Sequence, residues 1–504
     1  MALIIAISYF LLLSVGTSLW LRKKVKSGSD FVTGGGTVAW PLVAAGFVLA
    51  PLGSGHTLSL WESSADMGAA VLWWAIMSGG IFVPLFLLWF GPWFRRLQVQ
   101  TFPEGMGKIF GEKIGWMISA VFPAQLIGIC IAEVSATAAA LYALGGGALP
   151  LAPHCILIAV VLTILYIIAA GLMQVAWMNL FNATMLILGS FMAVFWTGSW
   201  LSGRGGWERI SDFYASAGTP WKTSLFNFSP EVIFTLIFPC LILTVFMQSA
   251  SQVQNQPMLM ARSESDIRRG VFWAALVNSF AAYPWVILAL VGMAIPAVAA
   301  KGAKLSVPVL ALEAFPPWMV GILMIALLAA TLSTTAALIL ASSHIIVHDI
   351  FKRACNPKMS DRTFLVLTRV MIGVCAVLVI IPALKLGSPV FSIFMWTFSF
   401  AIPVFGVYLI GMIWKVNKVA AWITISAGYA ANFYWTFASP TWLPPHLSLN
   451  LYPTTFATLL FGIGLNLILP GEPGYLRQLK ARAAKTGEQA AEAQMSGVMI
   501  SKGE

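Results

Sequence analysis

A membrane-length apolar run with proline and glycine in its middle constrains the fold of this chain most. Residues 44–61 read AAGFVLAPLGSGHTLSLW, with Pro51, Gly53 and Gly55 where a spanning helix favours Leu or Ala. Proline removes a backbone donor and clashes with the preceding turn, and glycine weakens a helix. In a bilayer the freed backbone groups must find other partners. We therefore expect a broken helix whose loose backbone lines a polar cavity near mid-membrane.

The composition predicts a protein that crosses a membrane many times. Of the 504 residues, 59% are hydrophobic and 9% are charged, whereas soluble domains carry about 25% charged residues. The net charge of +11 then reflects cytoplasmic loops rather than nucleic-acid binding, because Lys and Arg collect on that side of a membrane. The five cysteines are scattered without paired spacing, which argues against a disulfide framework or a zinc site.

Thirteen windows are apolar and long enough to cross a bilayer, which takes about 20 residues. The predicted fold is an all-α membrane protein with 13 transmembrane helices. The windows lie near 2–21, 38–61, 69–93, 114–142, 153–172, 176–202, 230–252, 270–299, 317–350, 363–384, 388–414, 419–437 and 453–470.

The positive charges predict how these windows are oriented. If the N-terminus lies outside, 23 of the 29 Lys and Arg fall on the cytoplasmic side, as the positive-inside rule requires. The other six are Arg204, Arg209, Lys222, Lys301, Lys304 and Lys385. We therefore expect a multi-pass protein of the cell (plasma or inner) membrane, with its N-terminus outside and its C-terminus in the cytoplasm.

A second proline, Pro239, predicts an internal repeat. It lies near the centre of window 230–252, five windows after the first broken one. Ten windows then form two sets of five, each opening with an interrupted helix, and an odd number of spans inverts the second set. The expected divisions are 1–37 (accessory helix and loop), 38–203 (first repeat), 204–229 (external loop), 230–416 (inverted second repeat), 417–470 (two further helices) and 471–504 (cytoplasmic tail).

Four hydroxyl side chains cluster in window 317–350, at Thr331, Ser333, Thr334 and Thr335. Hydroxyls on membrane helices often bond only to the carbonyl four residues earlier. Alternatively, Ser333 and Thr334 offer oxygen ligands to a hard monovalent cation, and carbonyls from the broken helix complete its shell.

This window resembles the defining span of the sodium/solute symporter family, to which the bacterial proline permease and the sodium/glucose cotransporters belong. The resemblance rests on Leu332-Ser333-Thr334 and on Asp349-Ile350-Phe351-Lys352. Other segments with family-like patterns are TFPE at 101–104, GLMQVAWMNLFN at 171–182, QPMLMARS at 256–263, and Glu62 with Gly68.

The resemblance implies two inverted five-helix repeats of the leucine-transporter type and a sodium ion bound between the first and eighth core helices. The implied sodium ligands are the carbonyls of Ala50, Gly53 and Ala330 and the hydroxyls of Ser333 and Thr334.

The chain also departs from the family pattern. Leu52 replaces an acidic residue found in the proline permease, and Asn179 and Asn182 replace an Asp and a Gln. Ala336 and Ala337 stand where some relatives have hydroxyls for a second sodium. We therefore expect one coupling sodium rather than two.

Glu133 is a carboxylate in the middle of window 114–142. An ionised carboxylate near the bilayer centre costs at least ~2.5 kcal/mol, so such residues usually have a function. It could contact an ion, a proton or a substrate amine, or it could be a protonated side chain bonded to neighbouring backbone. The other candidate substrate residues are Ser54, His56, Trp74, Gln125 and Pro239. His56 could instead only cap the helix, and Trp74 could be a lipid-facing anchor.

Three functions remain open on the sequence. The first is sodium-coupled symport of a small organic solute. Glu133 would suit a solute amine, and the positive N-terminal end of a broken helix would suit a solute carboxylate. These two features indicate the amino acid or organic carboxylate class. The second is proton-coupled or uncoupled transport on the same fold, and the third is a transporter-like sensor. An enzyme is not expected. The implied partners are the solute, sodium and the lipid bilayer; the sequence indicates no oligomeric state and is compatible with a monomer.

Overall fold

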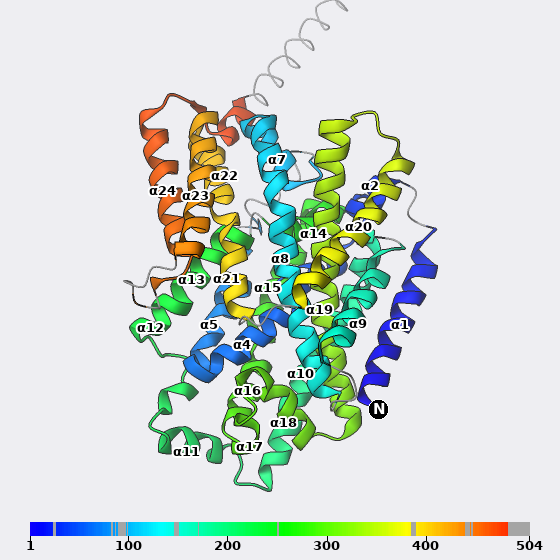
Figure 1. Ribbon diagram of the computed structural model, residues 1–504, viewed down its shortest axis with the longest axis vertical. Coiled ribbons are helices and arrows are strands. Elements are labelled where there is room, and N and C mark those ends of the chain that lie inside the picture. The colour runs from blue at the N-terminus through cyan, green and yellow to red at the C-terminus, as the bar shows by residue number, and fades with distance from the viewer. Residues whose placement is uncertain are drawn as a thin grey trace, which may run out of the picture.

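The computed structural model is almost entirely helical (Figure 1). It describes residues 1–23, 27–81, 84–85, 87–88, 97, 99–145, 151–169, 171–248, 251–384, 390–438, 444 and 447–481. Within these ranges the β-structure is one short antiparallel pair, β1 (Lys415–Val416) with β2 (Glu472–Pro473), and an isolated bridge between Val38 and Ala261.

The helices of the first part of the chain include two very long ones. They are α1 (Ala2–Leu21), α2 (Gly28–Thr33), η1 (Gly34–Gly36), α3 (Trp40–Leu49), α4 (Ser54–Met67), η2 (Gly68–Val71), α5 (Leu72–Ala75), the π-helix η3 (Ile76–Ile81), α7 (Phe102–Phe110), α8 (Glu112–Leu144), α9 (Leu151–Ile167) and α10 (Gly171–Ser202).

The helices of the second part include several π-helical turns. They are α11 (Glu208–Ser216), η4 (Pro220–Thr223), α12 (Pro230–Val232), η5 (Ile233–Ile237), α13 (Phe238–Leu243), η6 (Thr244–Gln248), α14 (Gln252–Met260), α15 (Glu264–Ala281), α16 (Tyr283–Met293), α17 (Pro296–Ala299), η7 (Ala303–Leu305), α18 (Ser306–Ala314), α19 (Pro317–Ile345), η8 (Ile346–Cys355), α20 (Asp361–Ala383), α21 (Val390–Ser399), α22 (Ala401–Ile413), α23 (Lys418–Ala438) and α24 (Leu451–Ile468).

The number of membrane crossings is only partly determined by these helices. Among the described residues, eight helical stretches are long and apolar enough to span a bilayer. Helix lies in each of the thirteen predicted windows, but some windows hold short or interrupted helices, as in 38–61 and 230–252. The all-α membrane architecture is therefore confirmed, whereas the count of thirteen and the division into inverted repeats remain predictions.

Helix α19 lies at the centre of the bundle and packs against α8, α9, α10, α1 and α20. In the most apolar 18-residue segment of Pro317–Cys355, 94% of the residues are buried, whereas in the corresponding segment of α1 22% are buried. Figure 1 shows α1 at one edge of the molecule and α23 and α24 at the opposite edge, with α8 and α19 between them. The outer helices expose large apolar side chains such as Leu12, Phe437 and Ile468, which a lipid environment accommodates and water does not.

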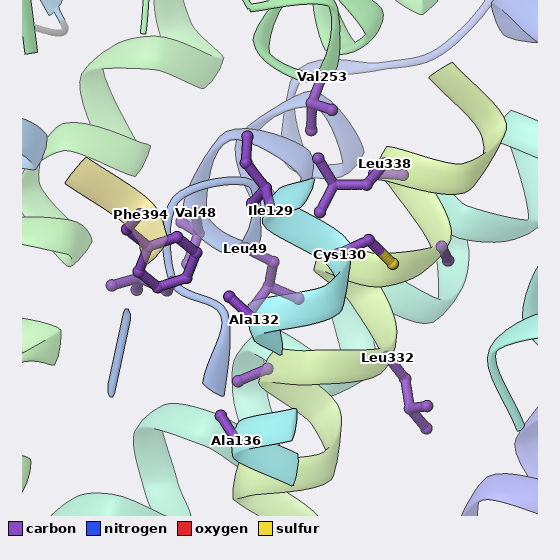
Figure 2. Close-up of a cluster of buried hydrophobic side chains, with 14 of the residues drawn as sticks. Val48, Leu49, Ile129, Cys130, Ala132, Ala136, Val253, Leu332, Leu338 and Phe394 are labelled. Carbon is purple, nitrogen blue, oxygen red and sulfur yellow. The ribbon is translucent and has the colours of Figure 1, made fainter. Parts of the chain in front are cut away.

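The interior around the end of α3 is lined by buried apolar side chains. Figure 2 shows side chains from α3, α8, α14, α19 and α21 gathered there, including Leu49, Ile129, Val253, Leu332 and Phe394. All five are buried. Polar groups that enter this region must therefore be paired with one another, because unpaired polar groups are costly in apolar surroundings.

Candidate functional site

The first core helix is broken where the sequence predicts. Helix α3 ends at Leu49 and α4 begins at Ser54, so residues 50–53 form a non-helical link. Pro51 supplies no backbone N–H to continue the helix. Gly53 is extended, with φ −72° and ψ 168°, and serves as the N-cap of α4 without a side chain to cap it. The interruption in window 38–61 is thereby confirmed, and it exposes the C-terminal end of one half-helix and the N-terminal end of the next.

The hydroxyl cluster of α19 faces three neighbouring helices. The Thr334 hydroxyl donates to the Leu49 carbonyl at the broken end of α3, with an oxygen–oxygen distance of 2.9 Å. Thr331 pairs with Thr137 of α8 at 2.6 Å, and Thr335 with Thr163 of α9 at 2.9 Å. Most of these hydroxyls also bond to carbonyls of their own helix, as expected for membrane helices. Thr334 is thus the member of the cluster that contacts the break.

The residues predicted to hold sodium lie near one another, but some of their oxygen atoms already accept hydrogen bonds. Ala50 lines two hollows: Thr334 lines the first with it, and Ser333 lines the second. The Ala330 carbonyl accepts hydrogen bonds from both of those hydroxyls, at 3.1 and 2.8 Å. The Gly53 carbonyl accepts from the Thr57 N–H and from the Thr57 hydroxyl, each at 3.0 Å. Both lone pairs of the Gly53 carbonyl are therefore occupied in this structure.

Glu133 lies at the start of α4. The Gly55 N–H donates to Glu133 Oε2 at 2.8 Å, and the Glu133 side chain is almost completely buried. A Cβ atom built on Gly53 would stand 2.1 Å from Glu133 Oε1, and one on Gly55 would stand 3.0 Å from it. The two glycines therefore let the carboxylate approach the backbone at the N-terminal end of α4, where helix dipoles favour negative charge.

A cavity lies beside the break. The space between its lining atoms has a volume of about 660 Å³, and this volume includes open solvent next to the cavity. Its polar lining residues are His56, Ser78, Glu133, Thr244, Ser251, Gln254 and Thr334, and its aromatic ones are Trp74, Phe394 and Phe398. A concave, largely apolar site with a few convergent polar groups is the usual form of a small-molecule site.

His56 presents an unpaired nitrogen in this cavity. Its Nε2 atom is buried without a hydrogen-bond partner, and its ring stands edge-on to Trp74 with centroids 5.1 Å apart. Buried polar atoms are normally paired, so an unpaired one at a cavity marks a place for a ligand group or water. Trp74 is buried against His56 rather than exposed as a lipid-facing anchor.

Some predicted substrate residues do not reach the cavity. Gln125 is buried on α8 two turns before Glu133, outside the described lining. Pro239 is buried within α13 and also lies outside that lining. Ser54 is the first residue of α4, but its side chain lies outside the described part of the chain. Thus His56, Glu133 and Trp74 are brought together, and Gln125 and Pro239 are not.

Comparison with known proteins identifies the family. The model of the sodium:solute symporter family matches residues 31–428. This chain belongs to the sodium:solute symporter family. It is a membrane transporter rather than an enzyme.

The relatives of this transporter include cotransporters of known name. It is 24% identical over 455 residues to the sodium/glucose cotransporter of Vibrio parahaemolyticus, covering 82% of this chain and 80% of that protein. It is 25% identical over 455 residues to sodium/myo-inositol cotransporter 2 of Rattus norvegicus, covering 82% of this chain and 66% of that longer protein.

The fold of the transporter is also known from solved structures. A Na+-coupled sialic acid symporter, in a substrate-bound outward-open state, matches with a TM-score of 0.80 at 17% identity, over 94% of this chain and 99% of that one. A nucleobase-cation-symport-1 family transporter, in a closed conformation, matches with a TM-score of 0.56 at 12% identity, over 88% of this chain and 95% of that one. These similarities establish the fold of the transporter.

The interruption of the seventh window of the transporter does not lie at Pro239. Pro239 lies between the π-helices η5 and η6, in a helical path that runs without a break from Pro230 to Gln248. Prolines and π-helical turns can bend a helix, and here they do not end it. A new helix, α14, begins at Gln252. The expectation of a break at Pro239 was therefore wrong, and the polar run SASQVQNQ was the better signal.

Asn179 and Asn182, two of the positions that differ from the family pattern, both bond to the Tyr166 hydroxyl. The Tyr166 hydroxyl donates to Asn179 Oδ1 at 2.8 Å and accepts from Asn182 Nδ2 at 2.7 Å. The Tyr9 hydroxyl lies 3.4 Å from Asn182 Oδ1. All of these groups are neutral, so this cluster between α1, α9 and α10 provides no carboxylate for a cation.

Two family motifs meet at the end of the molecule predicted to be cytoplasmic. Asp349 in η8 is fully buried and accepts from the hydroxyls of Thr101, at 2.8 and 2.9 Å, and Ser119, at 3.1 Å. Arg353 donates to Asp349 at 3.1 Å and also to Glu112. Thr101 is at the same time the N-cap of α7. The two motifs therefore tie η8 to α7 and α8, apart from the cavity.

Proposed function

We propose that this protein is a sodium-coupled symporter that carries a small organic solute across the cell membrane by alternating access. The observation that carries the proposal is the contact between the Thr334 hydroxyl and the Leu49 carbonyl, because it brings the hydroxyl helix to the break beside a cavity. Membership of the family and the sodium-coupled relatives support the same activity.

The proposed sodium ligands are the five predicted from the sequence. A hydroxyl that donates one hydrogen bond keeps two lone pairs, so Ser333 and Thr334 can coordinate a cation while donating to carbonyls. Ala50, the C-cap of α3, lines one hollow with Thr334 and another with Ser333. The Ala330 and Gly53 carbonyls would complete the shell, but the Gly53 carbonyl must first lose the Thr57 hydroxyl and the Ala330 carbonyl the Thr334 hydroxyl. Sodium binding is therefore expected to reorient the start of α4.

We propose that one sodium ion accompanies each solute molecule. A second cation in this bundle would need anionic or unoccupied oxygen ligands. Asn179 and Asn182 are neutral amides whose oxygen atoms accept hydrogen bonds from tyrosine hydroxyls. The alanines at 336 and 337 add no oxygen ligands from their side chains.

The cavity and the relatives together support an order in which solute classes should be tested. A solute of the amino acid or organic carboxylate class would place its carboxylate at the N-terminal end of a broken helix. At the start of α4, however, the Gly55 N–H already donates to the Glu133 carboxylate. The relatives named above are cotransporters of glucose and myo-inositol. Aromatic faces such as Trp74 and Phe394, next to polar groups, suit uncharged molecules with several hydroxyls. Sugars and polyols therefore come first in a solute screen, before amino acids and monocarboxylates.

A proton-coupled mechanism is the second candidate, because a buried carboxylate lines the cavity. In that mechanism Glu133 would take up and release the proton that drives transport. Uptake in proteoliposomes under a pH gradient without sodium would select this mechanism over the first.

The decisive experiment is uptake into proteoliposomes with and without a sodium gradient, using solutes found by a thermal-shift screen. We expect sodium-dependent uptake that falls at least tenfold when Ser333→Ala and Thr334→Ala are combined. The control is Ser342→Ala on the same helix, whose hydroxyl donates only to the Leu338 carbonyl among the described contacts. Sodium dependence that survives the double substitution would exclude this site.

A further inference from the structure

We infer that Glu133 is a specificity-determining residue: its carboxylate occupies the anion position at the start of α4 and excludes solutes that carry a carboxylate. The inference rests on the proposed function, since it concerns the solute cavity of a transporter. It goes further by assigning to one residue the rejection of a class of solutes.

The start of α4 is an anion site by construction. The helix runs for 14 residues from Ser54, and its N-cap residue Gly53 has no side chain to satisfy the first N–H groups. Unsatisfied N–H groups and the helix dipole attract negative charge there. Broken helices of secondary transporters commonly direct such ends at anionic groups of the solute. Here Gly55 donates to Glu133 instead.

The backbone around Glu133 is shaped to hold the carboxylate. A side chain at position 53 would collide with it, because a Cβ at Gly53 would lie 2.1, 2.4 and 2.4 Å from Oε1, Cδ and Oε2. The carboxylate therefore fills the space that a solute carboxylate would need in order to reach the same N–H group. This space belongs to the wall of the cavity, which Glu133 lines together with His56 and Thr334.

The described lining of the cavity carries no basic side chain. It includes no Lys or Arg, and His56 is the other titratable group in it. A carboxylate entering this space would meet a like charge, and like charges in a site of low dielectric repel strongly. A hydroxyl or an amine, in contrast, can donate to carboxylate oxygen atoms.

The first test does not require a known solute. In the purified full-length protein, Glu133→Ala would empty the carboxylate space at the start of α4. We expect a lower Tm than that of the unsubstituted protein, and a saturable rise in Tm with sodium acetate. Matched sodium chloride and acetamide should have no such effect. The unsubstituted protein should show no rise specific to acetate.

Two results of this test would overturn the inference. An absence of any acetate effect on Glu133→Ala, or an equal effect on the unsubstituted protein, would overturn the inference. If Glu133→Ala does not fold, Glu133→Gln tests the repulsion by the charge, because an amide keeps the shape and an acceptor oxygen while removing the charge. In that variant, carboxylate analogues of a transported solute should compete with uptake at least tenfold better than they do in the unsubstituted protein.

A charge-matched control is Glu62→Gln, which lies on the same helix outside the described cavity lining. It should leave the discrimination against carboxylates unchanged. The acetate result does not depend on sodium coupling, so failure of sodium-driven uptake would reject the proposed function without deciding this inference. Unchanged discrimination in Glu133→Gln would instead reject the inference alone.

Discussion

The Glu133 carboxylate restricts which residues can stand at position 53, and together with Phe394 it restricts position 55. Both positions are glycine: a Cβ at 53 would stand 2.1 Å from Glu133 Oε1, and one at 55 would stand 2.5 Å from the Phe394 ring and 3.0 Å from Glu133 Oε1. On the sequence, glycine in this stretch indicates only a weakened helix. In the structure the same glycines also provide the close approach of a side chain to the backbone. The residue and its two glycine neighbours are therefore one unit, and substitutions within it should not be additive.

Substitution of Gly53 tests this unit. We expect Gly53→Ala to lower the free energy of unfolding by about 1–3 kcal/mol, the usual cost of overpacking. The Glu133→Ala substitution should recover part of that loss in the double variant, because it removes the atoms that the new methyl group meets. Thermal unfolding of the purified protein measures both effects.

The control for this cycle is Gly373→Ala. Gly373 lies inside α20, and a Cβ there would meet nothing within 4 Å. This substitution should leave stability unchanged or raise it by up to about 1 kcal/mol, the difference in helix propensity. Strict additivity of Gly53→Ala and Glu133→Ala would contradict the steric argument.

At the scale of elements, hydrogen bonds to α14 and α15 fix the start of α3, whereas its end is interrupted. The Val38 N–H donates to the Met260 carbonyl at 2.9 Å, and the Arg262 N–H donates to the Val38 carbonyl at 3.0 Å. Asp266 of α15 accepts from the Trp40 N–H at 3.0 Å and from Arg262 at 2.8 Å. The half-helix before the first break is thus bonded to α14, the half-helix after the second interruption, so the two are expected to move together.

Removal of Asp266 tests this connection. Asp266→Ala leaves the Trp40 N–H without its partner, and we expect a loss of about 1–3 kcal/mol in the free energy of unfolding. The exposed Asp361 in the first turn of α20 gives a matched control, for which Asp361→Ala should change stability by less than about 0.5 kcal/mol. Equal effects of the two substitutions in thermal unfolding would mean that the connection contributes nothing to stability.

At the scale of the whole molecule, the two ends of the described chain lie at opposite ends of the bundle (Figure 1). Residues 203–229 cover the same end as the start of α1. There the Tyr214 hydroxyl donates to the Leu290 carbonyl at 2.8 Å, and Trp73 donates to the Leu225 carbonyl at 2.9 Å. Burial raises the pKa of Tyr214 to about 12, so this hydroxyl remains a donor to a higher pH than that of an exposed tyrosine.

The native cysteines test the predicted orientation in the membrane. Cys355 is exposed, and the other four cysteines are buried. With the C-terminus in the cytoplasm, Cys355 lies on the inner side. A membrane-impermeant maleimide should therefore label inside-out vesicles and leave right-side-out vesicles unlabelled. Cys355→Ser should abolish the signal, and labelling of right-side-out vesicles would reverse the orientation.

The sequence by itself determined the class of the molecule and the place of the first break. An apolar chain with few charges cannot fold as a soluble domain, and Pro51 close to Gly53 and Gly55 favours a break in the helix. The hydroxyls of 331–335 were also legible, because their spacing puts them on one or two turns of a buried helix. These are local effects, and local chemistry decides them.

Only the tertiary structure decided which groups meet. Pro239 looked like a second break, but the helix continues through it between two π-helical stretches, and the next helix begins at Gln252 after the extended Ser251. Glu133 was recognisable as unusual, yet its position against Gly55 depends on how α8 crosses α4. Contacts between residues 78 positions apart follow from the packing of whole helices, and no pattern within one segment encodes that packing.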